Sequence, residues 1–389
     1  MALVPVLGSV IVVVMTASFP VVLTGAMSVE MRQDIDFDNG SLGAAVLGYY
    51  VMSAALSTSC GRLTERFGSQ QALRVAAILG AVACTGIAFA DRLAWLVVFL
   101  IVGGVAMPLA QPASNAVIME RVPHHRRGLA FGIKQSSVPG GTALAGLAVP
   151  IVGLTVGWRW AFAGAAVMCL VAAATVPESA QRPRRSRSSD DVLRGSYGEL
   201  VVLAAAAALG AAPSMSLPVF LTASATGRGF SSAAAGALLT VGSVGGLAVR
   251  LLVGARADRR SGGHLRPIAG LMALGGLGLV GMTIDHPVAF TAATMLAFGA
   301  AWAWQGLFNH AVANRWDSSP AAATGVTQTG IFAGGIIGPL TFGLLTSRWS
   351  DDAGWLVLSV MITTAMCLVL AVRRWSSPTV PALGTLAGQ

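Results

Sequence analysis

The chain has 389 residues, of which 55% are hydrophobic and 11% charged, and its formal net charge is +9 at pH 7. Soluble domains carry roughly a quarter charged residues, so this composition excludes an ordinary water-soluble fold. All but one of the 25 basic residues are arginine. They lie mostly in short segments between apolar runs, without interleaved aromatic residues, which argues against a nucleic-acid-binding surface.

The apolar runs predict twelve membrane-spanning helices. Each run can cross a hydrocarbon core of about 30 Å, and none shows the alternation of polar and apolar residues that a barrel strand needs. The first run lacks a basic leader and a convincing cleavage site, so we interpret it as a retained span. In chain order the predicted spans cover approximately residues 6–26, 42–60, 71–90, 93–117, 129–153, 157–177, 199–222, 233–253, 267–284, 288–312, 324–346 and 354–372.

A polar stretch near the middle of the chain divides these spans into two groups of six. Residues 178–198 are rich in Pro, Ser and Arg, which is typical of a solvated linker. We therefore expect an N-terminal six-helix bundle at 1–177 and a C-terminal six-helix bundle at 199–373. Residues 374–389 are predicted to form a tail.

The distribution of arginine predicts the orientation of the spans. The connections that follow even-numbered spans, together with the tail, carry most of the arginines. The opposite side has only Arg32, Arg92, Arg159, Arg228 and Arg348. Because basic residues remain on the cytoplasmic side of a membrane, we expect a multi-pass protein of the plasma (inner) membrane with both termini in the cytoplasm.

The two halves are related in sequence. At a constant offset of 193 residues, Gly61, Glu65 and Arg66 correspond to Gly254, Asp258 and Arg259, while Gly132, Gln135 and Gly141 correspond to Gly325, Gln328 and Gly334. Six spans separate the copies, and this even number makes them parallel repeats about an axis normal to the membrane. Such repeats are typical of secondary transporters, in which two bundles rock about a shared site.

The segment GRLTERFG, from Gly61 to Gly68, resembles the loop motif between spans two and three of the major facilitator superfamily. GARADRR, from Gly254 to Arg260, resembles the weaker copy of that motif, and the similarity extends over essentially the full chain. The resemblance implies an all-α fold of two pseudo-symmetric six-helix bundles, with a central cavity lined by spans one, four, seven and ten. It also implies that a conformational switch involves Gly61, Glu65, Arg66, Gly68, Gly254, Asp258 and Arg259.

Several polar residues inside the spans are candidates for the cavity. The sole lysine, Lys134, lies in span five and either faces the cavity or extends to the inner surface. Arg250 lies only four residues from Gly254, so we expect it near the inner surface. The other candidates are Gln111 and Asn115 in span four, Gln135 and Gln328, and Trp302, Gln305, Asn309 and His310 in span ten. The alternative role for their amides is hydrogen bonding between helices.

No span interior contains Asp or Glu. This favours an anionic or neutral substrate over a cation and leaves His310 as the candidate for proton coupling. The four cysteines lack metal-site spacing, so neither a metal nor a cofactor is expected, and no oligomer is required.

We therefore predict a secondary active or facilitative transporter that moves a small solute, such as an organic anion, by alternating access. Efflux of amphipathic toxic compounds is the alternative. A transporter-like sensor or a membrane enzyme is disfavoured, since no catalytic motif is evident.

Overall fold

The computed structural model describes residues 3–123, 130, 133–176, 197–257, 265–316 and 320–375. In these residues all regular structure is helical. The N-terminal half contains α1 (Leu3–Ala26), α2 (Ser28–Met31), α3 (Asn39–Phe67), α4 (Ser69–Ala88), α5 (Leu93–Gly103), α6 (Ala106–Arg121), α8 (Ser137–Ala148), the π-helical turn η2 (Val149–Gly153) and α9 (Trp158–Thr175). The C-terminal half contains α10 (Tyr197–Gly227), α11 (Ser232–Ala257), α12 (Leu265–Gly281), α13 (Pro287–Ala301), α14 (Trp304–Arg315), α15 (Pro320–Arg348) and α16 (Asp351–Trp375).

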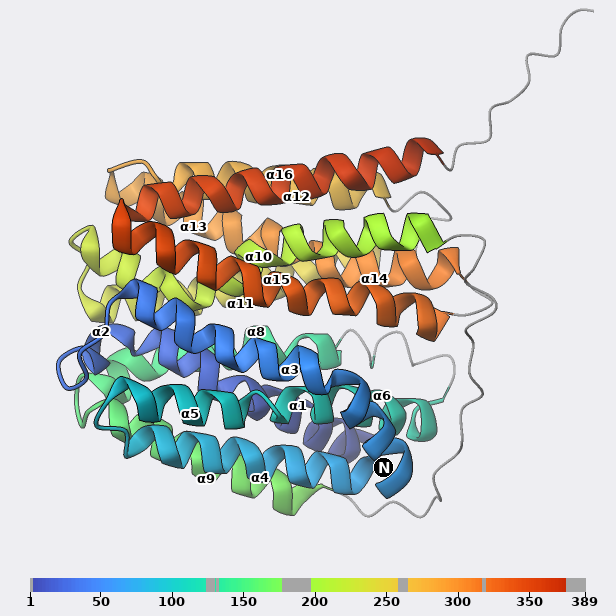
Figure 1. Ribbon diagram of the computed structural model, residues 1–389, viewed down its shortest axis with the longest axis horizontal. Helices are drawn as coiled ribbons and strands as arrows, with labels where there is room; N and C mark the ends of the chain where they lie inside the picture. The colour runs from blue at the N-terminus through green and yellow to red at the C-terminus, as the bar shows by residue number, and fades with distance from the viewer. Residues whose placement is uncertain are drawn as a thin grey trace, which may run out of the picture.

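The helices form two bundles that lie side by side, one from each half of the chain (Figure 1). Within the described residues, eleven helical stretches are long and apolar enough to cross a membrane, and α12 adds a shorter apolar helix. These elements confirm the predicted all-helical, multi-span fold. The predicted linker at 178–198 and the tail at 374–389 lie largely outside the described residues, although α10 begins at Tyr197.

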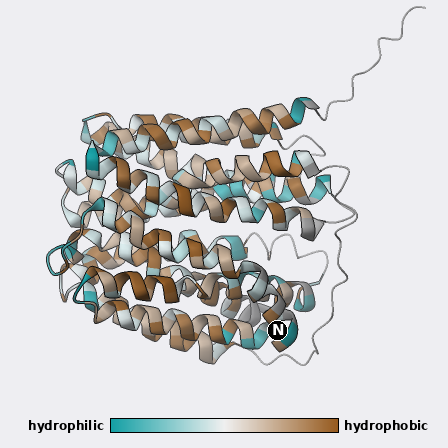
Figure 2. Ribbon diagram, viewed as in Figure 1, coloured by the Kyte–Doolittle hydropathy of each residue, from teal (hydrophilic) through white to brown (hydrophobic). Residues whose placement is uncertain are grey.

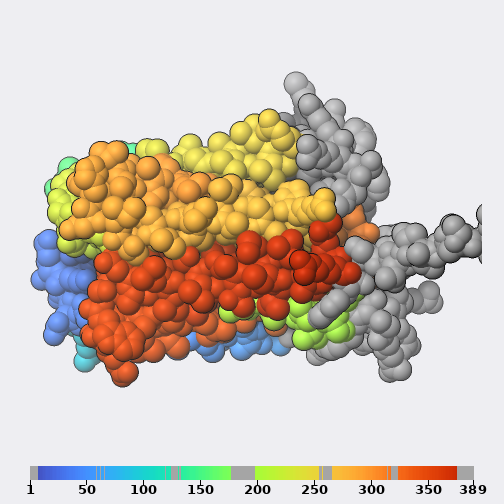
Figure 3. All heavy atoms as spheres, turned by 90° about the horizontal axis from the view of Figure 1, so that it is seen from above, coloured from blue at the N-terminus to red at the C-terminus, as the bar shows by residue number. Residues whose placement is uncertain are grey.

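The exterior of the bundles is apolar. Val167 and Leu170 on α9, Leu277 on α12 and Val360 on α16 are all more than half exposed. Apolar colour runs along the helices in Figure 2, while polar colour gathers largely at their ends. Figure 3 shows α12 and α16 covering one face of the C-terminal half. A soluble protein rarely exposes so much apolar surface, whereas lipid tails would cover this surface without cost.

Spans four and ten are each interrupted. Span four breaks between α5 and α6 at Gly104 and Val105, and span ten breaks between α13 and α14 at Trp302 and Ala303. In span four the cause is Pro108, which has no N–H for the Gly104 carbonyl one turn earlier. The hydroxyl of Ser53 on α3 donates to that carbonyl at 2.7 Å instead. A side chain from a neighbouring helix therefore satisfies the carbonyl that proline leaves free.

The two halves approach most closely near one end of the molecule. We call it the predicted outer end, and it carries the connections at residues 32–38, 154–157, 228–231 and 349–350. There a Cβ added to Gly236 would lie 2.6 Å from the Gly146 carbonyl oxygen, and one added to Gly43 would lie 2.6 Å from the Pro339 carbonyl oxygen. Because these helices touch backbone to backbone, the predicted outer end is closed.

Candidate functional site

A cavity of about 110 Å³ lies between the two halves. This volume holds on the order of ten water molecules. The cavity is lined by Ser18, Val21, Val22, Tyr49, Tyr50, Ser53, Met107, Gln111, Gln135, Val138, Pro139, Met215, Pro218, Arg250, Trp302, Gln305, Asn309, Gln328, Ile331 and Phe332. Both bundles contribute to this wall, and no carboxylate is among these residues.

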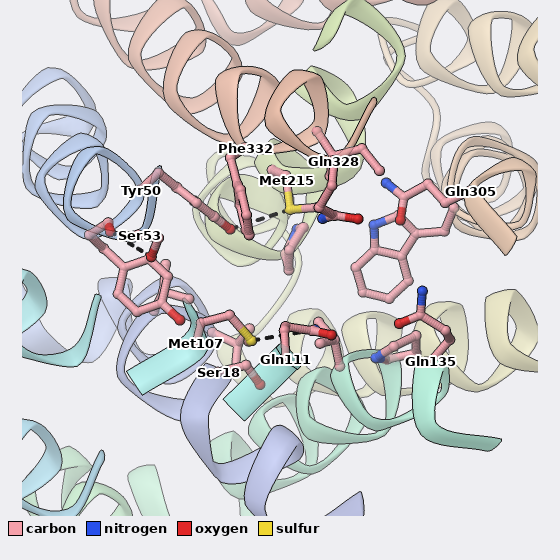
Figure 4. Close-up of a pocket in the computed structure, with 18 of the residues that line it drawn as sticks. Ser18, Tyr50, Ser53, Met107, Gln111, Gln135, Met215, Gln305, Gln328 and Phe332 are labelled. Carbon is pink, nitrogen blue, oxygen red and sulfur yellow. Dashed lines mark hydrogen bonds between the residues drawn. The ribbon is translucent and has the colours of Figure 1, made fainter. Parts of the chain in front are cut away.

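Four glutamines give the cavity its polar character. Gln305 and Gln328 from the C-terminal half face Gln111 and Gln135 from the N-terminal half across the opening (Figure 4). Neutral amides can donate and accept hydrogen bonds, so this wall can bind polar solutes that are hydrogen-bond donors, acceptors or both.

Arg250 on α11 supplies the cation of the cavity wall. Its Nη1 donates to the Gln135 carbonyl at 2.8 Å, and its Nη2 donates to the Trp302 carbonyl at 2.6 Å and to Gln305 Oε1 at 3.1 Å. The sequence suggested a place near the inner surface because Gly254 follows closely. However, α11 continues through Ala257, which leaves Arg250 well inside the helix and beside the cavity.

Proline explains why one of these carbonyls is available to Arg250. Pro139 lacks the N–H that would bond to the Gln135 carbonyl four residues earlier. The guanidinium of Arg250 reaches across from the other half and takes that carbonyl. The bond therefore connects the two bundles at the cavity.

A second proline positions Trp302 in the same way. Pro218 on α10 cannot donate to the Ser214 carbonyl, and the Trp302 indole Nε1 donates to that carbonyl at 2.5 Å. Trp302 is buried in the cavity wall. Its side chain is thus held by α10, while its own carbonyl binds Arg250.

Lys134 lies behind the cavity wall and is only 3% exposed. Its ammonium donates to Gln111 Oε1 and, at 2.8 Å, to Asn115 Oδ1. Because Gln111 lines the cavity and Lys134 does not, the lysine acts on the cavity through Gln111. Among the described residues, neither Lys134 nor Arg250 forms an ion pair with a carboxylate.

The amide residues of spans four and ten are related by the internal repeat. Gln111 and Asn115 correspond to Gln305 and Asn309, each pair 194 residues apart. In each half the glutamine accepts a hydrogen bond from a cation of the same half, Lys134 or Arg250. The two cations lie in spans that are not related by the repeat. The offset that relates the amides therefore does not predict which cation each glutamine binds.

The remaining candidates lie outside this wall. His310 is exposed, with its Nε2 3.0 Å from Asn314 Nδ2, and Asn115 is also exposed. Sequence reasoning missed the contribution of span two, where the Tyr50 hydroxyl contacts Met215 Sδ of the other half at 3.4 Å. An aromatic pair at Tyr49 and Tyr50, within a span that is otherwise rich in small residues, was the available signal.

The loop motif is only partly described. Gly61 lies in the last turns of α3, Arg66 is exposed, and Gly68 ends the helix with φ +94°, a conformation that favours glycine. Gly254 lies in α11. The side chain of Glu65, and Asp258 and Arg259 entirely, lie outside the described residues, so the switch motif stays a prediction.

The comparisons with known proteins identify the family. A model described as Major Facilitator Superfamily matches residues 7–339. The chain therefore belongs to the Major Facilitator Superfamily of membrane transporters, and it is not an enzyme. This confirms the resemblance that the loop motifs indicated.

The individual relatives leave the substrate open. An uncharacterized MFS-type transporter of Mycobacterium tuberculosis is 31% identical over 218 residues, which cover 54% of this chain and 48% of that protein. The chain thus spans about half the length of these curated relatives. The tetracenomycin C resistance and export protein of Streptomyces glaucescens is 27% identical over 48% of this chain and 35% of its own length.

Solved structures share the fold. A D-xylose–proton symporter superposes with a TM-score of 0.76 at 15% identity, covering 95% of this chain and 97% of the other. A bacterial homolog of the human lysosomal transporter Spinster, in an inward-facing and occupied conformation, gives a TM-score of 0.75 at 15% identity, with 95% and 96% coverage. At these identities the likeness concerns the fold alone.

Proposed function

We propose that this protein carries a small organic anion across the plasma (inner) membrane by alternating access. The single observation that carries the proposal is the cationic side chain of Arg250 in a cavity between the bundles whose lining holds no carboxylate. A basic residue at the centre of a span costs about 2.5–3.5 kcal/mol on insertion scales. A bound anion would neutralise the charge of Arg250 and so offset the cost of keeping it in the span.

Closure of the predicted outer end supports the alternating part of the proposal. Gly236, which packs against Gly146, and Arg250 lie on the same helix, and their separation of 14 positions corresponds to roughly 21 Å. The close backbone packing is thus on one side of the cavity. Opening of the other side would then expose the bound solute to the cytoplasm.

Efflux of an amphipathic compound is the second candidate. Part of the lining is apolar, with Val21, Met107, Met215, Ile331 and Phe332. The similarity to a resistance and export protein is in keeping with this alternative. A toxic aromatic compound would use the apolar wall, whereas a small anion would use Arg250.

Counterflow in proteoliposomes separates the candidates. Vesicles containing the purified protein would be preloaded with compounds sorted into anions, neutral polar solutes, cations and amphipathic drugs. We expect anions to accelerate uptake of their labelled counterparts. Acceleration by cations or drugs alone would reject the anion proposal, and repetition with and without a pH gradient would test proton coupling.

A further inference from the structure

Three polar atoms at one corner of the cavity are buried without a hydrogen-bond partner among the described residues. They are Arg250 Nε, Gln305 Nε2 and Asn309 Oδ1. A buried polar atom left unpaired costs about 1–3 kcal/mol. All three residues line the cavity, so small side-chain rotations would bring these covered atoms to its surface. A bound solute could then supply the missing partners.

The two unpaired donors lie on groups that are already in contact. Arg250 Nη2 donates to Gln305 Oε1 at 3.1 Å, which brings the guanidinium and the amide together and leaves Nε–H and Nε2–H without acceptors. The two oxygens of a carboxylate are acceptors only. One carboxylate can therefore satisfy both donors and also neutralise Arg250.

The unpaired acceptor requires a donor on the same ligand. Gln305 and Asn309 are four residues apart on α14, so their side chains share one face of the helix. Asn309 Oδ1 can accept from a hydroxyl group close to the carboxylate. An ammonium group fits less well, because the lining offers no carboxylate to balance its charge.

We infer that the corner formed by Arg250, Gln305 and Asn309 binds a small hydroxycarboxylate. Arg250 and Gln305 hold the carboxylate, and Asn309 accepts from the hydroxyl on the neighbouring carbon. This inference rests on the proposed transport of anions and narrows their chemistry. The cavity volume of about 110 Å³ suits a ligand of a few carbon atoms.

Three probes of nearly equal size separate the parts of this inference. Lactate carries both groups, propionate carries only the carboxylate, and lactamide carries only the hydroxyl. Binding to the full-length protein in detergent would be measured by ligand-induced thermal stabilisation over a concentration series. One hydrogen bond is worth about 0.5–1.5 kcal/mol, so lactate should bind about threefold to tenfold more tightly than propionate.

The variants assign each group to its residue. Arg250→Gln should weaken lactate and propionate binding by at least about tenfold, because hydrogen bonds to charged groups are worth about 1.5–3 kcal/mol. Arg250→Lys keeps the charge and should retain part of the affinity, which guards against a variant that fails to fold. Asn309→Ala should bind lactate no better than propionate. Arg266→Gln removes an exposed arginine outside the cavity and should behave like the wild type.

Each outcome is decisive for the inference. Equal affinity for lactate and propionate in the wild type, preserved discrimination in Asn309→Ala, or no stabilisation by any probe would overturn it. Because this assay measures binding and not flux, anion counterflow without hydroxyl discrimination would leave the proposed function intact while the hydroxycarboxylate site fails.

Discussion

At the scale of single residues, two cations serve the cavity in different ways. Arg250 is part of the wall, whereas Lys134 holds Gln111 and Asn115 in place from behind. The sequence offered Lys134 as a cation that faces the cavity, with extension to the inner surface as the alternative. The geometry favours Arg250 for binding the substrate's negative charge and makes Lys134 a positioning residue.

Lys134→Met should raise the half-saturating concentration for an anion by up to about tenfold, since one charged hydrogen-bonding partner of Gln111 is lost. Lys134→Arg should retain more affinity because it keeps the charge. Gln111→Leu should have a similar effect, and the double variant should lose less than the sum, as expected for residues in contact. Initial transport rates would be measured over a concentration series for the wild type and for each of these variants. Unchanged kinetics in well-inserted Lys134→Met would remove the lysine from this role.

The sequence could predict which residue types line the cavity better than it could predict their bonds. Gln111, Gln305 and Asn309 were visible as amides at helical spacing inside spans. The place of Arg250 was not, because it depends on a carbonyl that Pro139 frees in the other half of the chain. Such a contact joins residues 115 positions apart, and no local pattern reports it.

At the scale of elements, each half fastens its own connections at the predicted outer end with an ion pair. Arg159 at the start of α9 pairs with Asp34, and Arg228 at the end of α10 pairs with Asp352 at the start of α16. Arg159 and Asp352 are 193 residues apart, as the repeat requires, and Asp34 and Arg228 are 194 apart, so the two halves use nearly equivalent positions with reversed charge. Each pair ties the first span of its bundle to the sixth, which favours motion of a bundle as one body.

The pair at Asp34 predicts a dependence of stability on pH. The hydrogen bond from Arg159, followed by that from Trp158, holds the pKa of Asp34 below its usual range. A lowered folded-state pKa gives stabilisation above the unfolded value near 3.9. This stabilisation is lost as the pH falls through the folded value. Because both side chains are more than 40% exposed, solvent screening limits the contribution to about 1 kcal/mol or less.

Asp34→Asn should therefore lower the melting temperature slightly at pH 7, and its difference from the wild type should shrink as the pH falls below about 3.9. Asp36→Asn, an exposed neighbour in the same connection, is the matched control and should leave the melting temperature unchanged throughout this range. A difference between Asp34→Asn and the wild type that persists unchanged near pH 3 would contradict the role of this ion pair.

Glycines at the crossing of α8 and α11 allow the close packing of the predicted outer end. A Cβ at Gly236 would meet the Gly146 carbonyl oxygen at 2.6 Å, whereas a Cβ at Gly245 on the same helix would meet nothing within 4 Å. Gly236→Ala should thus disfavour the closed arrangement, and Gly245→Ala should not.

Spin labels can report this closure in a background with the exposed Cys367 replaced by serine. Asp91→Cys and Asp285→Cys place labels at exposed, repeat-related positions near the predicted outer end of each half. Electron–electron double resonance should give a longer mean distance in Gly236→Ala than in Gly245→Ala. Equal distances would show that the crossing does not limit closure.

At the scale of the whole molecule, hydropathy and the repeat predicted the architecture because the bilayer dictates both span length and helical structure. Individual boundaries shifted, and the breaks in spans four and ten were not predicted. Those breaks depend on partners from other helices, such as Ser53 for the Gly104 carbonyl. Hydropathy averages over such a turn and does not detect it.

The orientation in the membrane is still a prediction from the arginine bias. Reporter fusions at Asn39 and Asp285 should be located outside the cell, and fusions at Arg185 and Arg260 inside. As the control, each position would carry in turn a reporter that is active only outside and a reporter that is active only inside. One position on the opposite side from the one expected would contradict the predicted twelve-span orientation.

The most direct test of Arg250 as the anion-binding cation is the initial rate of anion counterflow by Arg250→Gln in proteoliposomes, compared with wild type at matched protein content. We predict that the wild type exchanges a small organic anion and that Arg250→Gln loses at least about tenfold in rate at subsaturating anion. Arg266→Gln should retain the wild-type rate. An undiminished rate in well-inserted Arg250→Gln would contradict the assignment of the cavity as the anion pathway.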